Sequence, residues 1–442
     1  AVTSGNNLTA GKAVDIAALN APAVKAVTGA LSGSLLASAA VTVAQANIGT
    51  KGKALKTSVT IGDNNVLAAE TISVKAETNA KQDVDMQALS ISASPFPGGA
   101  AQINSGGSSI YSDVTVDAGS NVYRGKALGG NNYGAADLLL EAGNSVSQKV
   151  RASGISAGTA FATGTNLAAT QAVLTTKVTA AGSKAGSHIN DLTVNAKSYA
   201  AIDSEANGYG GALIDISPYA AKVENEYRAD TDVELSGDWT TDGVVTAGAI
   251  NGSDIDLHAD AVRAAVVGGS GVWLKNDVSN AANVAVKDAK ITSNGAQVYT
   301  AQNNVDHTGK IDASGYGGVN VNASDLNDAF AFTAGVTVDK SELTALGNSG
   351  SITAQALTQG TINSTNSLKS AGLVPVSLAA SKHKLVYDNS VDITGSTLKT
   401  AKKDQDITLA ASDDTEVRLE TIADTQGGAV GAASARAENE LA

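Results

Sequence analysis

The sequence contains no cysteine. This absence excludes disulfide bridges, thiolate catalysis and zinc or iron sites with cysteine ligands. It is in keeping with export to an oxidising exterior, where a chain without thiols has nothing to oxidise. The sequence therefore directs attention away from redox and cysteine chemistry.

Aromatic residues are scarce as well, at 4% of the chain, with five prolines and one methionine against 46 glycines. Hydrophobic residues nevertheless reach 43%, which is enough to build a core. A globular core of this size would normally use more Phe, Tyr and Trp. A core of Ala, Val, Ile and Leu in thin layers is typical of a solenoid.

Long apolar runs and basic clusters are also missing. The most apolar stretch, 30–46, is interrupted by serines and a glycine and is shorter than the ~20 residues that span a bilayer. The net charge is −13, from 43 acidic and 30 basic side chains, so we expect no nucleic acid partner. The sequence starts without a signal peptide and ends within a repeat-like segment, which predicts a piece of a longer chain.

A short element, Asp-apolar-x-apolar-x-Ala, recurs along the chain and has the alternation of a half-buried strand. Looser copies start at Asp15, Thr71, Gly318 and Ser351, and the intervals between successive starts are uneven. Another copy, 113–118, falls inside one interval and indicates more than one turn per interval. The clearest copies are 137–142, 191–196, 254–259 and 406–411.

A second element follows the first at a nearly constant distance. Residues 221–227 follow the copy that starts at Asp191, and the similar residues 435–441 follow the copy that starts at Asp406 with almost the same offset. Glycine pairs recur between the two elements. In 191–196 we expect Leu192, Val194 and Ala196 to point inward, with the intervening residues in solvent.

These patterns predict an all-β fold, a parallel β-helix of right-handed type, formed by 1–442 as a single repetitive segment. At about 20 residues per turn the chain makes roughly 20 to 22 turns, and 22 turns stacked at ~4.8 Å form a rod ~105 Å long. Loop insertions are expected near 94–111 and 119–135, where Gly, Pro and Asn gather. Residues 430–442 have helical propensity, but their match to 221–227 favours a strand.

The pairing of these strands with Gly-Gly-Ala-Val-Gly-Ala-Ala-Ser-Ala at 427–435 resembles filamentous adhesins of leukotoxin type, among the large haemagglutinin-like exoproteins. The resemblance implies a repetitive stalk on the bacterial cell surface or outside the cell, exported through an outer-membrane partner or a fused barrel. It also implies roles in adhesion to host or neighbouring cells or matrix, in aggregation, or in fibre formation. It supplies no catalytic motif.

The sequence offers few candidate catalytic or metal-binding residues. Residues 154–158 fit the Gly-x-Ser-x-Gly pattern, but they lack the strand-to-helix context of a nucleophile elbow. The four histidines, His188, His258, His307 and His383, are widely spaced, and we expect surface positions. Asp306 and His307 would point to opposite faces of a strand. Trp239 and Trp273 are expected to pack at an edge or under a loop.

Acidic residues form the remaining candidate site. Asp230, Asp232 and Glu234 would share one face of a strand, which makes them weak candidates for calcium, although the known calcium loop patterns are missing. We expect a structural or adhesive scaffold without enzymatic activity or a cofactor, acting through self-association. The alternatives are a polysaccharide-acting β-helix enzyme of lyase or tail-spike type and a calcium-stabilised passenger.

Overall fold

The computed structural model describes residues 1–442 except 94–97, 130–131, 403–404 and 429. Every named element in the described residues is a strand, and none of these residues forms a helix long and apolar enough to cross a membrane. The strands are β1 Asn7–Thr9, β2 Ala13–Asn20, β3 Ala23–Ser34, β4 Ala37–Ile48, β5 Leu55–Ile61, β6 Val66–Ala68, β7 Thr71–Ser92, β8 Gly99–Ala118, β9 Val122–Arg124, β10 Ala127–Gly129, β11 Asn132–Tyr133, β12 Ala136–Gly158, β13 Phe161–Ala180, β14 Ile189–Thr241, β15 Val245–Ser293, β16 Gln297–Asp339, β17 Glu342–Ala345, β18 Ile352–Thr394, β19 Thr397–Thr400, β20 Ile407–Gln426 and β21 Ala432–Leu441.

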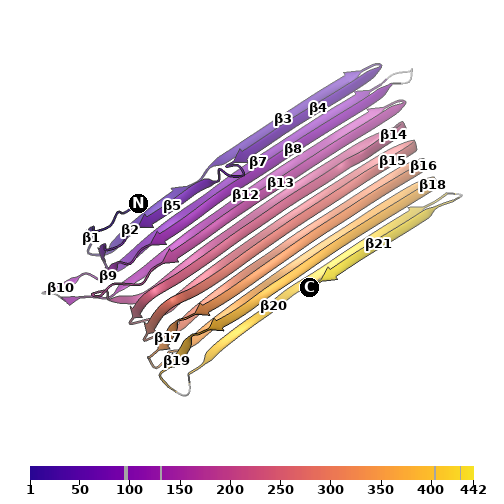
Figure 1. Cartoon of the computed structure of the whole chain (residues 1–442). Coiled ribbons are helices and arrows are strands. Elements are labelled where there is room, and N and C mark those ends of the chain that lie inside the picture. The colour runs from indigo at the N-terminus through magenta and orange to yellow at the C-terminus, as the bar shows by residue number, and fades with distance from the viewer. Residues whose placement is uncertain (94–97, 130–131, 403–404, 429) are drawn as a thin grey trace.

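The chain forms a flattened solenoid with two layers (Figure 1). Each coil runs along one layer, turns tightly and runs back along the other. The first half of β14 pairs with β12, and its second half pairs with β13. We call the two halves of a coil the forward and return strands. The edge at which forward strands turn into return strands is the distal edge, and the edge that carries β17 and β19 is the proximal edge.

Parallel pairing stacks the forward strands in the order β2-β7-β12-β14-β15-β16-β18-β20. Successive coils differ in length, since Val245 pairs with Gln297 in a shorter coil and Ile72 pairs with Leu138 in a longer one. The parallel β-solenoid is therefore confirmed, but the predicted short coil is wrong, and so is the predicted count of turns. In the described residues the stack has eight coils, far fewer than predicted.

The error came from treating the interval between repeats as several short turns, whereas each such interval is one coil. Leu138, for example, pairs with Ile72 on one side and with Leu192 on the other. Strands β7 and β12 are 22 and 23 residues long, which is far above the usual length. At ~3.3 Å per residue such a strand spans ~75 Å, and eight coils at ~4.8 Å rise ~38 Å. The molecule is a broad slab and not the long rod that the short coil predicted.

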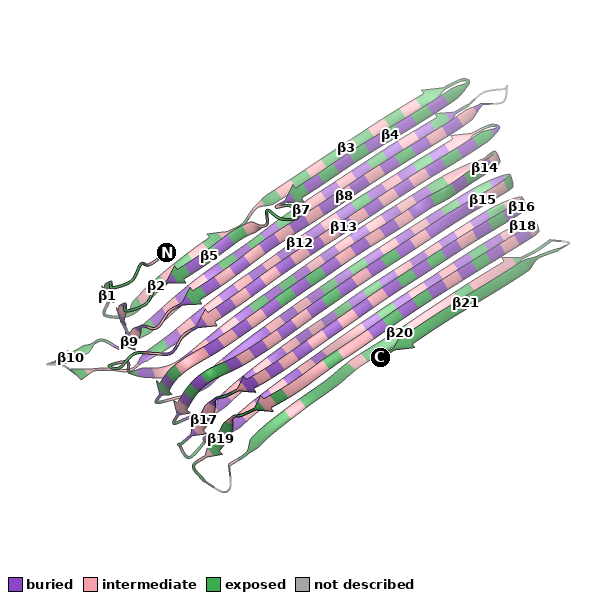
Figure 2. Cartoon of the chain, in the orientation of Figure 1, coloured by how far each residue is buried: buried purple, intermediate pink, exposed green. Residues whose placement is uncertain are grey.

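The repeated sequence elements do mark equivalent positions. Leu138, Leu192, Ile352 and Ile407 stand in one column of the forward layer, through Val245 and Gln297. In 191–196 the inward set is buried as predicted. Figure 2 shows the same alternation of buried and less buried residues along the strands of the stack. The copy at 254–259 is not equivalent, because Ile255 pairs with Ile202 further along the strand.

The second element is also placed as its spacing implied. Tyr227 and Leu441 stand in one column of the return layer, through Val278, Phe330 and Leu385. Residues 432–441 form strand β21, which confirms the preference for a strand over a helix.

Two apolar cores lie between the layers, one towards the proximal edge and one in the middle of the slab. A column of buried polar side chains separates them and includes Asn144, Ser198, Asn251 and Asn303. The Asn251 Nδ2 group donates to the Ala281 carbonyl at 2.8 Å and to Asn303 Oδ1 at 3.0 Å. The hydrogen bonds of Asn251 therefore tie the two layers and neighbouring coils together.

The two predicted loop insertions differ in outcome. Residues 99–111 belong to strand β8, so the loop predicted over 94–111 is wrong there, and 94–97 lie outside the described residues. Glycine and serine in this segment are strand residues because their neighbours in β4 and β13 pair with them. Within 119–135 the chain leaves the main sheet to form β9 and the antiparallel pair β10–β11.

Candidate functional site

Asp230, Asp232 and Glu234 lie on one outer face of the return half of β14, as the sequence predicted. Glu234 accepts a hydrogen bond from Lys177 Nζ at 3.1 Å, and Asp232 accepts one from Asn283 Nδ2 at 3.1 Å. Burial, followed by the charge of Asp232, raises the pKa of Asp230, and Lys177 opposes the rise. Within the described residues no group of three or more acidic or histidine side chains is arranged to hold a metal ion.

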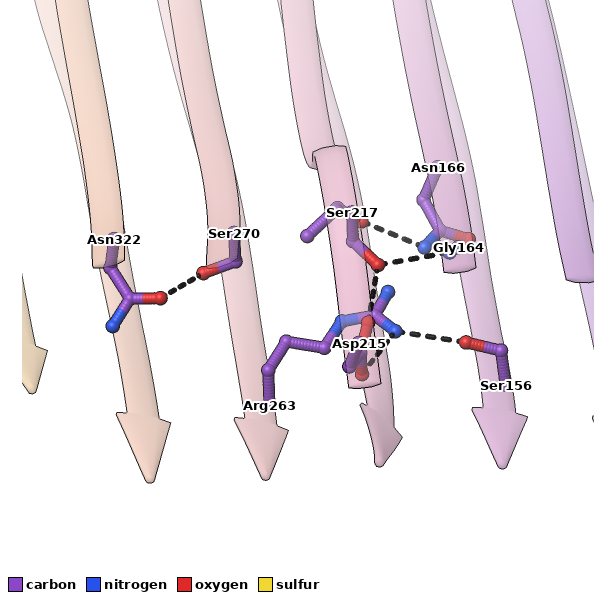
Figure 3. A network of polar contacts seen from close by, with 9 residues as sticks. Ser156, Gly164, Asn166, Asp215, Ser217, Arg263, Ser270 and Asn322 are labelled. Atoms are coloured by element: carbon purple, nitrogen blue, oxygen red, sulfur yellow. Dashed lines mark hydrogen bonds and ion pairs between the residues drawn. The ribbon is translucent and has the colours of Figure 1, made fainter. Parts of the chain in front are cut away.

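Ser156, the centre of the Gly-x-Ser-x-Gly match, lies inside strand β12 and is fully buried. It belongs to a network behind the distal edge (Figure 3). Arg263 Nη1 donates to Ser156 Oγ at 2.9 Å and reaches Asp215 Oδ2 at 3.4 Å. Ser217 Oγ donates to Asp215 Oδ1 at 2.9 Å. The serine accepts from a cation and has no general base beside it, so this network does not make it a nucleophile.

Arg263 and Asp215 form a salt bridge between buried side chains, which are 3% and 0% exposed. Burial raises the pKa of Asp215, and Arg263 beside it opposes that rise. The Nε and Nη2 atoms of Arg263 have no hydrogen-bond partner among the described residues. The ion pair and Ser156 link three coils, because Ser156, Asp215 and Arg263 belong to β12, β14 and β15.

Two of the four histidines are buried, contrary to the surface positions predicted. His307 is 1% exposed and stands in the column of Ile255 and Ile362, with its Nε2 atom 2.8 Å from Ser253 Oγ. Burial lowers the pKa of His307 to about 3. Asp306 faces outward, so the prediction that these neighbours point to opposite faces is confirmed.

His383 lies in the middle core, where its Nδ1 atom is 2.9 Å from Asp328 Oδ2. Ser364 Oγ donates to the same carboxylate oxygen at 2.5 Å. In this arrangement the carboxylate stands between the serine and the histidine, so the histidine cannot act as a base on the serine. All three side chains are buried, which keeps them away from any substrate in solvent.

The tryptophans lie at opposite edges of the slab. Trp239 is buried at the proximal edge and stacks with Tyr123 at a ring distance of 6.3 Å. Trp273 packs against Tyr219 on the return layer near the distal edge, with ring centres 4.8 Å apart. Trp239 fills an edge, as the sequence indicated, whereas Tyr219 beside Trp273 remains 46% exposed.

The sequence did not reveal a groove of about 600 Å³ on the outer face of the forward layer. Its lining includes Tyr199, Asp254, Asp306, Thr361 and Glu416, which come from five successive coils. Burial and the two aspartates raise the pKa of Tyr199. The lining contains no lysine or arginine. Asp254 and Asp306 are one coil apart in the sequence, and Glu416 is two coils beyond Asp306. This spacing was the available signal, but the predicted coil length was too short to show it.

Comparison of the chain with protein-family models, with curated proteins and with solved structures finds no match. The function therefore has to be argued from the slab itself.

Proposed function

We propose that this chain is a structural scaffold of an extracellular or cell-surface kind, which extends by stacking further copies coil on coil. The observation that carries the proposal is that both end coils leave strand edges unpaired in the described residues. These edges are β2, β3 and β4 at one end, and β20 and β21 at the other. Unpaired edges are templates for further strands.

The two ends also expose residues from inward positions. Ile407 and Leu409 of β20 are 44% and 49% exposed, although the equivalent Ile352 and Ala354 of the preceding coil are buried. At the other end Val14 and Ile16 are only partly buried. A copy stacked on either end would cover this apolar surface, which favours association.

A single register satisfies both layers at once. Following the columns through the stack, Ile407 is equivalent to Val14 in the forward layer, and Leu441 is equivalent to Ile48 in the return layer. The sequence separation between the members is the same in both pairs. Strand β20 can therefore pair with β2 and β3 of a second copy while β21 pairs with β4 of that copy.

The end coils have opposite charge. Residues 1–61 contain five lysines and a single acid, which gives a net charge of +4. Residues 406–442 contain eight acids and two arginines, which gives −6. In the common register Arg418 lies over Lys25, but Glu416 and Glu420 flank it on the same face. Opposite charges favour head-to-tail stacking over head-to-head contact, so the assembly is open-ended.

Charge exchange at the two ends tests the proposal. We expect E416K/E420K to lower the average assembly size, measured by analytical ultracentrifugation at low salt, and adding K25E to the same chain to restore part of it. The control D277K/D325K changes the charge by the same amount in the middle coils. A wild-type chain that stays monomeric at all concentrations, or equal loss in the control, would contradict stacking.

The acidic groove supports a second candidate, a polysaccharide-acting enzyme that uses Asp254 and Asp306 as a pair of carboxylates. The test is release of reducing ends or unsaturated sugars from anionic and neutral polysaccharides, with D254N/D306N as the control. Activity that disappears in this variant would favour the enzyme over the scaffold.

A further inference from the structure

The distal edge is built with polar residues inside and apolar residues outside. Its inward side chains are small or polar, and Ser217, Ser270, Asn322 and Ser377 are all buried. The outward side chains at the same edge are large and apolar. The exposed ones are Leu31, Leu35, Leu36, Val41, Val43, Ile91, Ile103, Ile155, Phe161, Leu213, Ile216, Val262, Val266, Val267, Val319, Val321, Leu373, Leu378 and Val430. We call this set the distal band.

Charged residues avoid the turn at the distal edge in every coil. No charged residue lies between Lys25 and Lys51, and the next two coils have similar charge-free stretches, 86–112 and 152–176. The later coils have shorter charge-free stretches, such as 313–324 and 370–381. Two charges, Asp215 and Arg263, do fall at this edge, but they are buried and paired with each other. The outer surface next to the turn is therefore uncharged in every coil, and charge returns in the last two coils with Lys369 and Asp424, in the column of Val262.

The backbone at the distal edge is paired as well. Strands β14, β15, β16 and β18 continue through the turn without a break. Across the turn Ile214 pairs with Val267, Val267 with Val319, and Val319 with Val374. Backbone groups that bond to neighbouring coils do not need water, which is the condition for a strand to lie in an apolar medium.

We propose that the distal edge inserts into one leaflet of a lipid bilayer and anchors the slab edge-on to a membrane. Alternation of apolar outward and polar inward residues is typical of strands in contact with lipid. In the C-terminal coils a charge-free stretch such as 313–324, folded in half, gives ~6 residues or ~20 Å of depth. This exceeds the ~15 Å of hydrocarbon in one leaflet and is less than the ~30 Å of the bilayer.

Aromatic side chains lie where the slab would meet the head groups. Tyr209 and Tyr219 are 37% and 46% exposed near the inner margin of the distal band, whereas Tyr316, which is 50% exposed, pairs with Ala264 and lies nearer the rim. Trp273 packs on Tyr219, and Lys222 Nζ lies 5.6 Å from the centre of the Tyr219 ring. Tyr and Trp with a nearby lysine are favoured at membrane interfaces, because their rings are apolar and their ends are polar.

The shape of the distal band favours lipid over a second copy of the chain. Val262 and Val319 stand on opposite halves of their coils, so exposed apolar side chains occupy both outer faces, and Leu213, Val266 and Leu373 add the rim between them. A flat partner covers one face, and edge-to-edge contact covers only the rim. A bilayer surrounds the edge and covers both outer faces and the rim. This anchoring goes beyond the scaffold role proposed above.

Flotation of the intact chain with phosphatidylcholine vesicles on a density gradient tests the inference. We expect the wild-type protein to float with vesicles, with little effect of salt or of added anionic lipid, because the distal band is uncharged. The variant V266D/L373D should bind at least tenfold less, since both side chains lie on the rim. The matched control is L346D, which places a charge at an exposed leucine of the proximal edge and should float as the wild type does.

Two results would overturn the inference. One is a wild-type protein that remains at the bottom of the gradient. If this protein also forms dimers, and V266D/L373D makes it monomeric, the distal band is a contact surface for a second copy. The other is equal loss of flotation in L346D and V266D/L373D when circular dichroism shows that both remain folded. Neither result bears on stacking, which is measured without lipid.

Discussion

His307 makes the stability of the slab depend on pH, and replacing it with isoleucine should remove that dependence. Burial lowers its pKa from 6.5 to about 3. Between these values the unfolded chain binds a proton that the folded chain does not, so stability from this residue is full above pH 6.5 and is lost as the pH falls towards 3. At ~1.4 kcal/mol per pH unit well below the unfolded pKa, the loss between pH 7 and pH 4.5 is about 2.5 kcal/mol.

Isoleucine suits this position because Ile255 and Ile362 occupy the same column in the adjacent coils. Ser253, the hydrogen-bond partner of the histidine, keeps a contact with Asn280 Nδ2 at 3.3 Å. Removing the histidine therefore leaves no new charge and no isolated hydroxyl. The substitution should cost little at pH 7 and should stabilise the protein at pH 4.5.

Urea unfolding of wild-type protein and H307I at pH 7 and pH 4.5 measures the effect. The difference between the proteins should change by about 2.5 kcal/mol in favour of H307I at the lower pH, because carboxylates titrate in both and cancel. An unchanged difference would refute the reasoning. A titration midpoint of His307 near 6.5, measured by nuclear magnetic resonance, would refute it independently.

Two further substitutions test packing. R263M should cost about 3–5 kcal/mol because it leaves Asp215 buried without its partner, and D215N/R263M should regain most of that loss in a double-mutant cycle by urea unfolding. G360A should cost about 2 kcal/mol or more, because Gly360 has a φ of +137° and an added Cβ would lie 1.8 Å from the Val305 carbonyl oxygen. G33A, whose Cβ would meet open space, should change the melting temperature little. Equal effects of the two glycine variants would contradict the coil register.

The sequence predicted the fold class because alternation and spacing are local properties. The inward positions of Leu192, Val194 and Ala196 and the match between Tyr227 and Leu441 followed directly from them. The size of the coil did not, since serine, glycine and asparagine at 99–111 have the composition of a loop and become strand only by pairing with β4 and β13. A column of strands stabilises residues that would not form a strand alone.

The site was harder to predict than the fold for the same reason. Asp254 and Asp306 belong to one groove because they are paired residues of successive coils, and Arg263 meets Ser156 from two coils away. His307 stands in the column of Ile255 and Ile362, and His383 stands in the column of Asn276 and Asp328, so only the register shows that they are buried. At the distal edge polar residues point inward and apolar residues point outward. This is the opposite of the usual alternation, in which the apolar residues of a strand are expected to face the core.

Electron microscopy of the purified chain tests the central claim, that this is a broad coil-on-coil scaffold, most directly. We predict ribbons ~75 Å wide with a ~4.8 Å axial repeat, whose lengths are multiples of the ~38 Å contributed by eight coils. Compact particles, or thin rods of the width expected for much shorter coils, would contradict the account.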